Sequence, residues 1–308
     1  MLAITGASGR LGSNIVDALL NHSLIKPEEL VLCTSGDASA SRWDSLKTKG
    51  VHVRFADFDD QQSMIKAFTG CERLILVSTP RIQLDFGDAP HGQGREKHHF
   101  AAIEAARSAG VSHIYYTSLA FSSDSVAGVM QAHLRTEEYL QNLKKIGWSI
   151  IREGLYNESW PLYFGHFQLP NDDRKEVVIA GDGQISWTPI EDMGLGTAIV
   201  ATDDPKNWAG RTFYLSSNTT RNLHDIAKQV SALQGYDVKP KIVSRDEHVE
   251  FYVKERGMDE ATVKWWASTY DALKRGECDI KDDTLAKLLE GRSTLREPVE
   301  DKVRKMMG

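Results

Sequence analysis

The chain begins with the stretch "MLAITGASGRLG" (1–12), in which a short apolar run leads into three glycines spaced three residues apart. Gly6 lets the chain turn sharply off a strand, Gly9 lets backbone N–H groups approach a pyrophosphate, and Gly12 lets the next helix pack closely. The N-terminus of that helix offers free N–H donors and a partial positive charge to phosphates. A strand before the glycines and an amphipathic helix after them predict a dinucleotide-binding βαβ unit. A glycine-rich turn without a ligand is the alternative.

Short β-rich runs alternate with helical periods through the first half of the chain. The runs that predict strands are 2–5, 30–34, 51–56, 73–78, 113–118 and 148–153. Because these runs read as buried strands separated by helices, they predict a parallel sheet that is covered on both faces. The expected fold is therefore α/β, a Rossmann-type doubly wound parallel sheet with ligands at the carboxyl ends of its strands.

The pattern changes after residue 155. Residues 176–188, "EVVIAGDGQISWT", indicate two short strands around a Gly-Asp-Gly turn, and residues 211–217 indicate one more strand. The rest is mostly helical, so we expect an NAD(P)-binding Rossmann domain and a smaller, discontinuous, mostly helical C-terminal substrate-binding lobe. The expected domain comprises residues 1–155 and about 186–217, and the expected lobe comprises residues 156–185 and 218–308.

The composition excludes several classes of partner. The chain has 308 residues, and its net charge of −6 without a concentrated basic run argues against a nucleic-acid surface. Its three cysteines are widely separated, which suits a reducing compartment, and no apolar run approaches the ~20 residues that span a bilayer. His98 and His99 have no partner at metal-ligand spacing and are expected on a solvated helix face. We expect a cytoplasmic monomer or homodimer with no metal and no membrane or nucleic-acid partner.

Several stretches carry a resemblance to a known family. They include "ITGASGRLGSNIVDALL" (4–20), "AARSAGVSHIYYTSLAF" (105–121), "IREGLYNESW" (151–160) and "AGDGQISWT" (180–188). In these stretches the chain resembles the NmrA-like group of atypical short-chain dehydrogenases/reductases, and within it the branch of NAD(P)H:quinone oxidoreductases and triphenylmethane reductases. The resemblance covers almost the whole chain in order. It implies the fold and the subfamily, and it leaves the substrate open.

The end of the second strand bears on the choice of dinucleotide. An NAD enzyme usually carries Asp or Glu there, which accepts a hydrogen bond from the ribose 2′-hydroxyl. Here the strand ends in "CTSG" (33–36), so no acid stands there to repel a 2′-phosphate. The sequence therefore favours NADP(H) over NAD(H). Arg10 and Ser35 are the candidates to hold the phosphate and Arg42 is a weaker one, while an exposed helix-start residue is the alternative interpretation of Arg10.

The resemblance implies the remaining contacts of the cofactor. Asp57 and Phe58 would flank the adenine, and Val77, Ser78 and Thr79 would line the path toward the nicotinamide. A helix cap or turn residue is the alternative for Asp57. The expected cofactor-binding residues are Gly6, Ser8, Gly9, Arg10, Leu11, Thr34, Ser35, Asp57, Phe58, Val77, Ser78, Thr79, His133, Gly154 and Tyr156.

The catalytic dyad of short-chain dehydrogenases is missing. Short-chain dehydrogenases commonly place Tyr-x-x-x-Lys on the helix after the fifth strand, where the Lys lowers the pKa of the Tyr that passes the proton. In extended members a Glu follows the Lys by four residues. If Glu137 is taken as that Glu, the Lys position lies four residues before it and is occupied by His133. The Tyr position lies four residues earlier still and is occupied by Val129. The expected catalytic residues are His133, which would bond the ribose hydroxyls, Ser118 at the strand end, and Tyr156 as the remaining proton donor. A buried structural histidine and a core aromatic are the alternatives for His133 and Tyr156.

The missing dyad indicates the kind of acceptor. Reduction of an ordinary ketone builds alkoxide charge and needs a positioned acid, whereas hydride transfer to a quinone gives a resonance-stabilised phenolate. The sequence therefore predicts an NADPH-dependent reductase of quinone-like or other conjugated aromatic acceptors. The alternative is a non-catalytic NAD(P)-sensing regulator of the NmrA-like group that acts through protein–protein contact.

Two further features concern the substrate. The polar, glycine-rich loop 80–94 directly follows the fourth strand, and loops of this length at a ligand edge are often lids. Phe121, Trp160 and Trp265 are expected to form an aromatic wall that stacks on a flat ring. The expected partner is a small aromatic or conjugated substrate.

Overall fold

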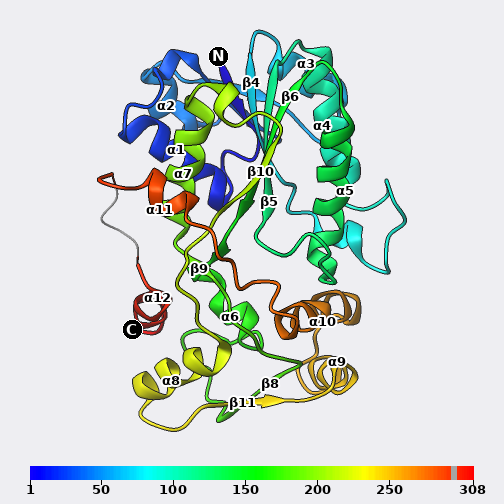
Figure 1. The fold of residues 1–308 in the computed structure, drawn as a ribbon, viewed down its shortest axis with the longest axis vertical. Helices are drawn as coiled ribbons and strands as arrows, with labels where there is room; N and C mark the ends of the chain where they lie inside the picture. The colour runs from blue at the N-terminus through cyan, green and yellow to red at the C-terminus, as the bar shows by residue number, and fades with distance from the viewer. Residues whose placement is uncertain (293–296) are drawn as a thin grey trace.

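A seven-stranded sheet organises the computed structural model, which describes residues 1–292 and 297–308 (Figure 1). Its strands are β1 (Leu2–Ile4), β2 (Leu30–Thr34), β3 (His52–Phe55), β4 (Arg73–Val77), β5 (His113–Leu119), β6 (Gly147–Glu153) and β10 (Arg211–Leu215). They lie in the order β10-β6-β5-β4-β1-β2-β3, and every neighbouring pair is parallel. This doubly wound order confirms the expected Rossmann-type fold.

Alternate side chains of each strand enter two separate hydrophobic cores. In β1, Ile4 packs in the core under α1 and α7, whereas Ala3 packs in the core on the opposite face, under α3, α4 and α5. The helices around the sheet are α1 (Arg10–Asn21), α2 (Asp44–Thr48), α3 (Gln61–Phe68), α4 (Glu96–Ser108), α5 (Gly128–Asn142) and α7 (Ile190–Thr202). Because helices cover both faces, the carboxyl edge of the strands is the part of the sheet that remains for a ligand.

A second lobe lies beyond that edge (Figure 1). It contains α6 (Trp160–Tyr163), β8 (Glu176–Ile179), α8 (Leu223–Gln234), β11 (Lys239–Ile242), α9 (Arg245–Lys254), α10 (Glu260–Lys274) and α12 (Val299–Met307). The pair β7 (Leu155–Tyr156) and β9 (Trp187–Thr188) connects the two parts, and α11 (Thr284–Leu288) packs on α7. Residues 293–296 of the expected lobe lie outside the described residues. In the described part of the chain, no helix is both long and apolar enough to cross a membrane.

The two short strands predicted around the Gly-Asp-Gly turn are present as β8 and β9. The strands β8 and β9 do not pair with each other: β8 pairs with β11 and β9 pairs with β7, both in parallel. The glycines between them serve close packing instead. A Cβ on Gly183 would lie 2.0 Å from the Leu273 carbonyl oxygen, and one on Gly181 would lie 2.8 Å from the Tyr270 carbonyl oxygen. These glycines therefore let the segment lie against the end of α10.

Buried histidines are a feature of both lobes. His99, His113, His133 and His248 are each at most 3% exposed. Burial lowers the pKa of all four imidazoles, to about 4 for His113 and His248 and well below the usual value for His99 and His133. The folded protein therefore keeps these rings neutral at pH values where the unfolded chain protonates them.

We expect this difference to make the protein less stable in mild acid. A histidine with a lowered pKa in the folded state stabilises the protein fully above the unfolded pKa of about 6.5, and this stability is lost as the pH falls below it. Between pH 7.5 and 5.5 the loss should be about 1 kcal/mol for each such histidine. Urea unfolding at the two pH values measures it.

His248 offers a direct check, because neither of its ring nitrogens has a hydrogen-bond partner in the described residues and it packs between Tyr252 and Tyr270. The substitution His248→Phe should reduce the loss of stability between the two pH values. His52→Phe, at an exposed position in β3, should leave it unchanged. An unreduced loss in His248→Phe would contradict this account.

Candidate active site

A cavity of about 510 Å³ runs along the carboxyl edge of the sheet, from the glycine loop to the end of β6. The expected cofactor residues that line it are Gly6, Ser8, Gly9, Arg10, Leu11, Thr34, Ser35, Asp57, Phe58, Val77, Ser78, Thr79, His133 and Tyr156. Gly154 is not among its lining residues. A Cβ on Gly154 would lie 2.2 Å from the Thr188 hydroxyl oxygen, so this glycine permits close packing against β9.

The glycine loop has the geometry of an anion site. Gly6 has φ +60°, in the left-handed region that favours glycine. A Cβ on Gly12 would lie 2.1 Å from the Gly6 carbonyl oxygen, so only glycine allows α1 to start this close to the loop. Gly9 caps α1 without a side-chain hydrogen bond, and the first turn of α1 carries no acid. The N–H groups at this helix end are therefore available to a pyrophosphate.

Three arginines lie near the other expected end of a dinucleotide. Arg10 lines the cavity and forms no ion pair with any described residue. Arg81 also lines it, but its guanidinium is paired with Asp57, at 3.6 Å, and with Asp59. Arg42 is outside the cavity lining and stacks 4.7 Å from the centre of the Trp43 ring. Arg10 is thus the lining arginine whose charge is free for a ligand.

His98 and His99 were expected on a solvated face, and this is wrong. Both are buried where α4 packs on the sheet. The ring of His98 stacks on Phe58 with 5.7 Å between ring centres. The Nε2 atom of His99 accepts a hydrogen bond of 3.1 Å from the backbone N–H of Thr79. The two histidines therefore support residues of the cavity wall from behind.

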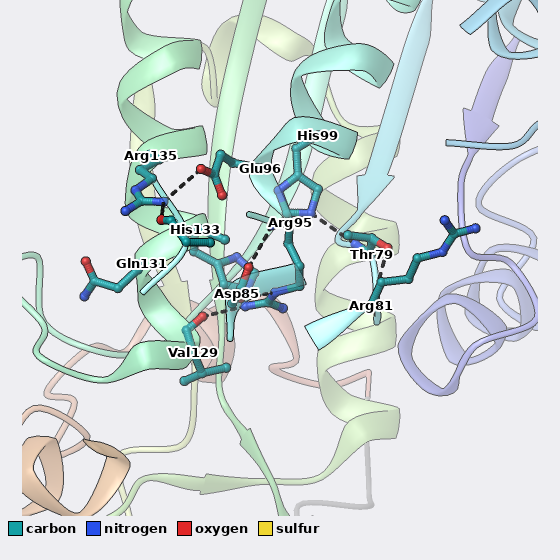
Figure 2. A network of polar contacts seen from close by, with 12 residues as sticks. Thr79, Arg81, Asp85, Arg95, Glu96, His99, Val129, Gln131, His133 and Arg135 are labelled. Atoms are coloured by element: carbon teal, nitrogen blue, oxygen red, sulfur yellow. Dashed lines mark hydrogen bonds and ion pairs between the residues drawn. The ribbon is translucent and has the colours of Figure 1, made fainter. Parts of the chain in front are cut away.

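The hydrogen bond from Thr79 fixes the positions of the imidazole protons, because a backbone N–H can only donate. His99 must therefore carry its hydrogen on Nδ1, which lies 2.9 Å from the Thr136 hydroxyl oxygen. The Thr136 hydroxyl in turn donates to the carbonyl of Ala132 at 2.7 Å. This part of the network leaves His99 no free acceptor, and Figure 2 shows its contact with Thr79.

The same logic sets the tautomer of His133. The Tyr116 hydroxyl lies 2.8 Å from Nδ1 of His133 and 3.3 Å from Nδ1 of His99. Because the His99 nitrogen is a donor and the Thr136 hydroxyl gives its hydrogen to Ala132, we assign the hydrogen of the 2.8 Å contact to Tyr116, which then donates to His133. Burial, and then the positive charge of Arg95, hold the pKa of His133 well below its ordinary value, so the ring is neutral. Its hydrogen is then on Nε2, and as His133 lines the cavity this N–H is available to a ligand.

Arg95 is a cavity residue that the sequence analysis missed. It is only 4% exposed, and its Nε donates to the Asp85 carboxylate at 2.6 Å. Its Nη2 donates at 2.7 Å to the carbonyl of Val129, the residue at the position of the missing tyrosine. Arg95 lines the cavity together with His133, and Figure 2 shows the two side chains, Arg95 at the N-cap of α4 and His133 on α5. A cation is therefore fixed beside the place of the absent dyad.

Buried charges also anchor the loop 80–94, so it is not a free lid in this structure. Glu96 is fully buried, accepts a 2.8 Å hydrogen bond from the Gly92 N–H and pairs with Arg135 at 2.9 Å. Arg135 also donates to the carbonyl of Ala89 at 2.9 Å. The loop is thus held at its middle and at its end, as Figure 2 shows for the pair Glu96–Arg135.

Beyond this loop lies an open groove of about 1380 Å³ between α5 and the helices α9 and α10. Trp265 lines it and lies 6.0 Å from the Arg95 guanidinium, as an aromatic wall residue would. The other two expected wall residues lie elsewhere: Phe121 and Trp160 are fully buried in the core of the second lobe. Aromatic content alone did not distinguish wall residues from core residues.

Ser118 and Tyr156 differ in their freedom to react. The Ser118 hydroxyl donates at 2.6 Å to Glu137, which Arg152 holds at 2.6 Å, so the Ser118 proton is committed within the protein. Tyr156 lines the cavity, and burial raises the pKa of its hydroxyl. Tyr156 is therefore a neutral phenol in the wall of the cavity.

These features define a dinucleotide site on a doubly wound sheet, with polar groups at the end distant from the phosphate cradle. The family model described as "NmrA-like family" matches residues 1–255. The chain belongs to this family, as the sequence indicated.

Known relatives agree with this assignment. The chain is 27% identical over 309 residues to the NmrA-like family domain-containing oxidoreductase flvB of Aspergillus flavus, covering 99% of this chain and 94% of that protein. It is 27% identical to quinone oxidoreductase 2 of Escherichia coli, covering 94% and 93%. Its fold is similar to triphenylmethane reductase of Citrobacter sp. solved with NADP(H), with a TM-score of 0.78, 26% identity and 99% coverage of both chains. These similarities identify the chain as an oxidoreductase of the family.

The phosphate cradle can be tested at Gly9. Its backbone, with φ −78° and ψ 172°, is accessible to any residue, and an added Cβ would lie 3.2 Å from the Gly6 carbonyl oxygen. Gly9→Val should therefore fold, while its branched side chain should weaken nucleotide binding at least tenfold by blocking the N–H groups. Fluorescence titration with NADPH measures the binding, and Asp17→Asn, on the exposed side of α1, is the control. A folded Gly9→Val protein with unchanged affinity would contradict the cradle.

Proposed function

We propose that this chain is an NADPH-dependent reductase that transfers hydride to a quinone-like or other conjugated aromatic acceptor. The observation that carries the proposal is the polar end of the cavity, where His133 offers a neutral N–H beside the buried cation of Arg95 while the Tyr-Lys dyad is missing. The named relatives support the cofactor, since the triphenylmethane reductase structure contains NADP(H) and a quinone oxidoreductase structure from Escherichia coli contains NADPH.

The residues around the cavity suit this cofactor. The glycine loop and the start of α1 would hold the pyrophosphate, and Arg10 with Thr34 and Ser35 would hold the 2′-phosphate. Asp57 and Phe58 would flank the adenine. When bound, the cofactor supplies the hydride; the protein residues bind it, orient it and stabilise the charge that develops on the acceptor.

The donors at the polar end explain the preference for a conjugated acceptor. Hydride addition to a quinone leaves negative charge that is spread over the ring and the oxygen atoms. The His133 N–H and the Arg95 guanidinium can stabilise such charge in a site of low dielectric constant without giving up a proton. Reduction of a simple ketone would instead need a general acid, which is typically worth 10²- to 10⁴-fold in rate.

The surface argues for an enzyme rather than a regulator that docks through an apolar face. Among the described residues, five large apolar side chains are exposed: Phe55, Val126, Leu162, Leu233 and Ile242. They belong to five different segments, and Val126 is part of the groove beside the active site. A docking surface would gather such side chains into one patch.

Cofactor preference gives the first test of the proposal. Because no acid follows β2 and Arg10 is unpaired, we expect NADPH to bind more tightly than NADH. Arg10→Ala should reduce the ratio of the NADH to the NADPH dissociation constant about tenfold. Fluorescence titration of both nucleotides measures it. Arg256→Ala is the matched control, because Arg256 is exposed on the second lobe and lies outside the cavity lining. Equal affinities of the wild type for the two nucleotides would contradict this part of the proposal.

The role of His133 gives the second test. His133→Ala removes an N–H that stabilises the developing charge, so hydride transfer should slow on the order of a hundredfold, with a smaller loss of NADPH affinity because phosphate contacts remain. The rate is measured as single-turnover NADPH oxidation by a benzoquinone. Because His133 is neutral, the wild-type rate should show no step near pH 6.5.

The exposed His91 in the loop provides the control variant His91→Ala, which should react at the wild-type rate. If a folded His133→Ala enzyme is as fast as wild type, this histidine is structural only.

A further inference from the structure

Glu153 is a buried carboxyl group that the mechanism above does not use. It is the last residue of β6, it lines the cavity, and it is 1% exposed. Its Oε1 accepts a hydrogen bond of 2.6 Å from the Thr197 hydroxyl, and its Oε2 is buried without a partner among the described residues. No described cation pairs with it, since the preceding Arg152 reaches the other face of the sheet and binds Glu137.

An unpaired carboxylate in such a place would be very costly, whereas a neutral carboxylic acid costs much less. Burial raises the pKa of Glu153 to about 8, with a smaller opposing effect of the Thr197 hydroxyl. Glu153 is therefore mostly protonated at pH 7. Protonated, it is an O–H donor without an acceptor, set in the wall of a ligand cavity.

The neighbours of Glu153 do not supply a compensating charge. Its partners on the adjacent strands are Leu119 in β5 and Leu215 in β10, which are apolar. From β7, Tyr156 faces the same cavity as a neutral phenol. On the α1 side, the charge of Arg10 acts on Tyr156 and is not among the influences on the pKa of Glu153.

We propose that Glu153 is a redox-linked proton site: it stays a carboxylic acid while reduced cofactor is bound and becomes a carboxylate when the oxidised, positively charged form is bound. The proposal rests on the proposed function, in which the glycine loop takes the phosphates and the adenine lies beyond β2. We place the nicotinamide at the Glu153 end of the cavity, because β6 lies on the other side of β1 from β2 and β3. NADPH and NADP⁺ share their phosphates and adenine, and they differ in the charge of that ring. A positive charge beside a buried carboxyl group favours its ionised form.

The reaction balances with this proton. Two electrons and one hydrogen nucleus move to a quinone as hydride, which forms a C–H or O–H bond there and leaves one negative charge on oxygen. The O–H bond of Glu153 breaks, its proton passes to solvent, and the carboxylate remains to balance NADP⁺. The anionic oxygen of the reduced quinone, held by His133 and Arg95, takes its own proton from solvent. Solvent returns the proton to Glu153 when the oxidised cofactor leaves.

Thermodynamic linkage provides a test that needs no acceptor. If NADP⁺ lowers the pKa of Glu153, then NADP⁺ must bind more tightly as the pH rises from 6 to 9, while NADPH must not gain in the same way. Both nucleotides carry the same phosphates, so the effect of phosphate titration on binding drops out of the ratio of their dissociation constants. We expect this ratio to change on the order of tenfold over that range, in favour of NADP⁺.

The experiment is a fluorescence or calorimetric titration of the wild type, Glu153→Gln and Glu158→Gln with NADPH and NADP⁺ at pH 6, 7, 8 and 9. Glutamine keeps the shape of the side chain and the oxygen that Thr197 contacts, but it cannot ionise. The ratio should become independent of pH in Glu153→Gln. It should keep its wild-type pH dependence in Glu158→Gln, a nearby acid paired with Lys302 outside the cavity lining.

Calorimetry in buffers of different ionisation enthalpy adds a second measurement. At pH 7, NADP⁺ binding should release more protons from the wild type than NADPH binding does, and Glu153→Gln should lose this difference. A ratio that does not change with pH in the wild type, or that changes equally in Glu153→Gln, overturns the inference. Failure of both nucleotides to bind would instead overturn the proposed function itself, and binding with the expected linkage but no quinone reduction would overturn only the acceptor.

Discussion

The arrangement of the polar end depends on one hydrogen bond, from the backbone N–H of Thr79 to Nε2 of His99. A backbone amide cannot reverse its role, so it fixes the His99 tautomer, leaves the Tyr116 proton to His133 and puts the remaining hydrogen of His133 on Nε2. Each step joins a different element: the end of β4, then α4, β5 and α5. The direction of a donor in the cavity is thus set by the backbone at the end of β4, and no step requires a charged imidazole.

Both faces of β6 bury ionisable side chains, but only one face pairs them with an opposite charge. Arg152 and Glu137 form a pair on the α5 side, where each ion satisfies the other and Ser118 adds a donor. One residue further along, the alternation of the strand turns Glu153 to the cavity side, where no described cation meets it. A paired ion stays ionised when buried, while an unpaired carboxyl group keeps its proton. Two adjacent residues of one strand therefore differ in charge state, because strand alternation gives them different surroundings.

The fold was predictable from the sequence because its signals are local. The strands lie close to the predicted runs since the central ones are apolar and buried on both sides, while the edge strand β3 is partly exposed. The glycine spacing marks a turn whose geometry only glycine allows at Gly6 and Gly12. What failed depends on distant partners. Nothing near Gly183 in the sequence shows that the end of α10 will pack against it. Likewise Arg95 pairs with Asp85, ten positions away across an irregular loop, and Phe121 and Trp160 look like wall aromatics until their burial is known.

A hydride transfer in this cavity would create two charges at once, positive on the cofactor and negative on the acceptor. His133 and Arg95 stabilise the negative charge with hydrogen-bond donors that are already in place before the reaction. This avoids the cost of reorienting dipoles while the charge develops. The cation of Arg95 is itself half-neutralised by Asp85, so it can attract an anion without holding it as firmly as a free guanidinium would. The positive charge cannot be met in the same way, because a permanent carboxylate in so dry a place would be unstable before the cofactor is oxidised. A carboxyl group that ionises only when that charge appears avoids this conflict, and among the acids that line the cavity Glu153 has the burial and the missing partner that such a role requires.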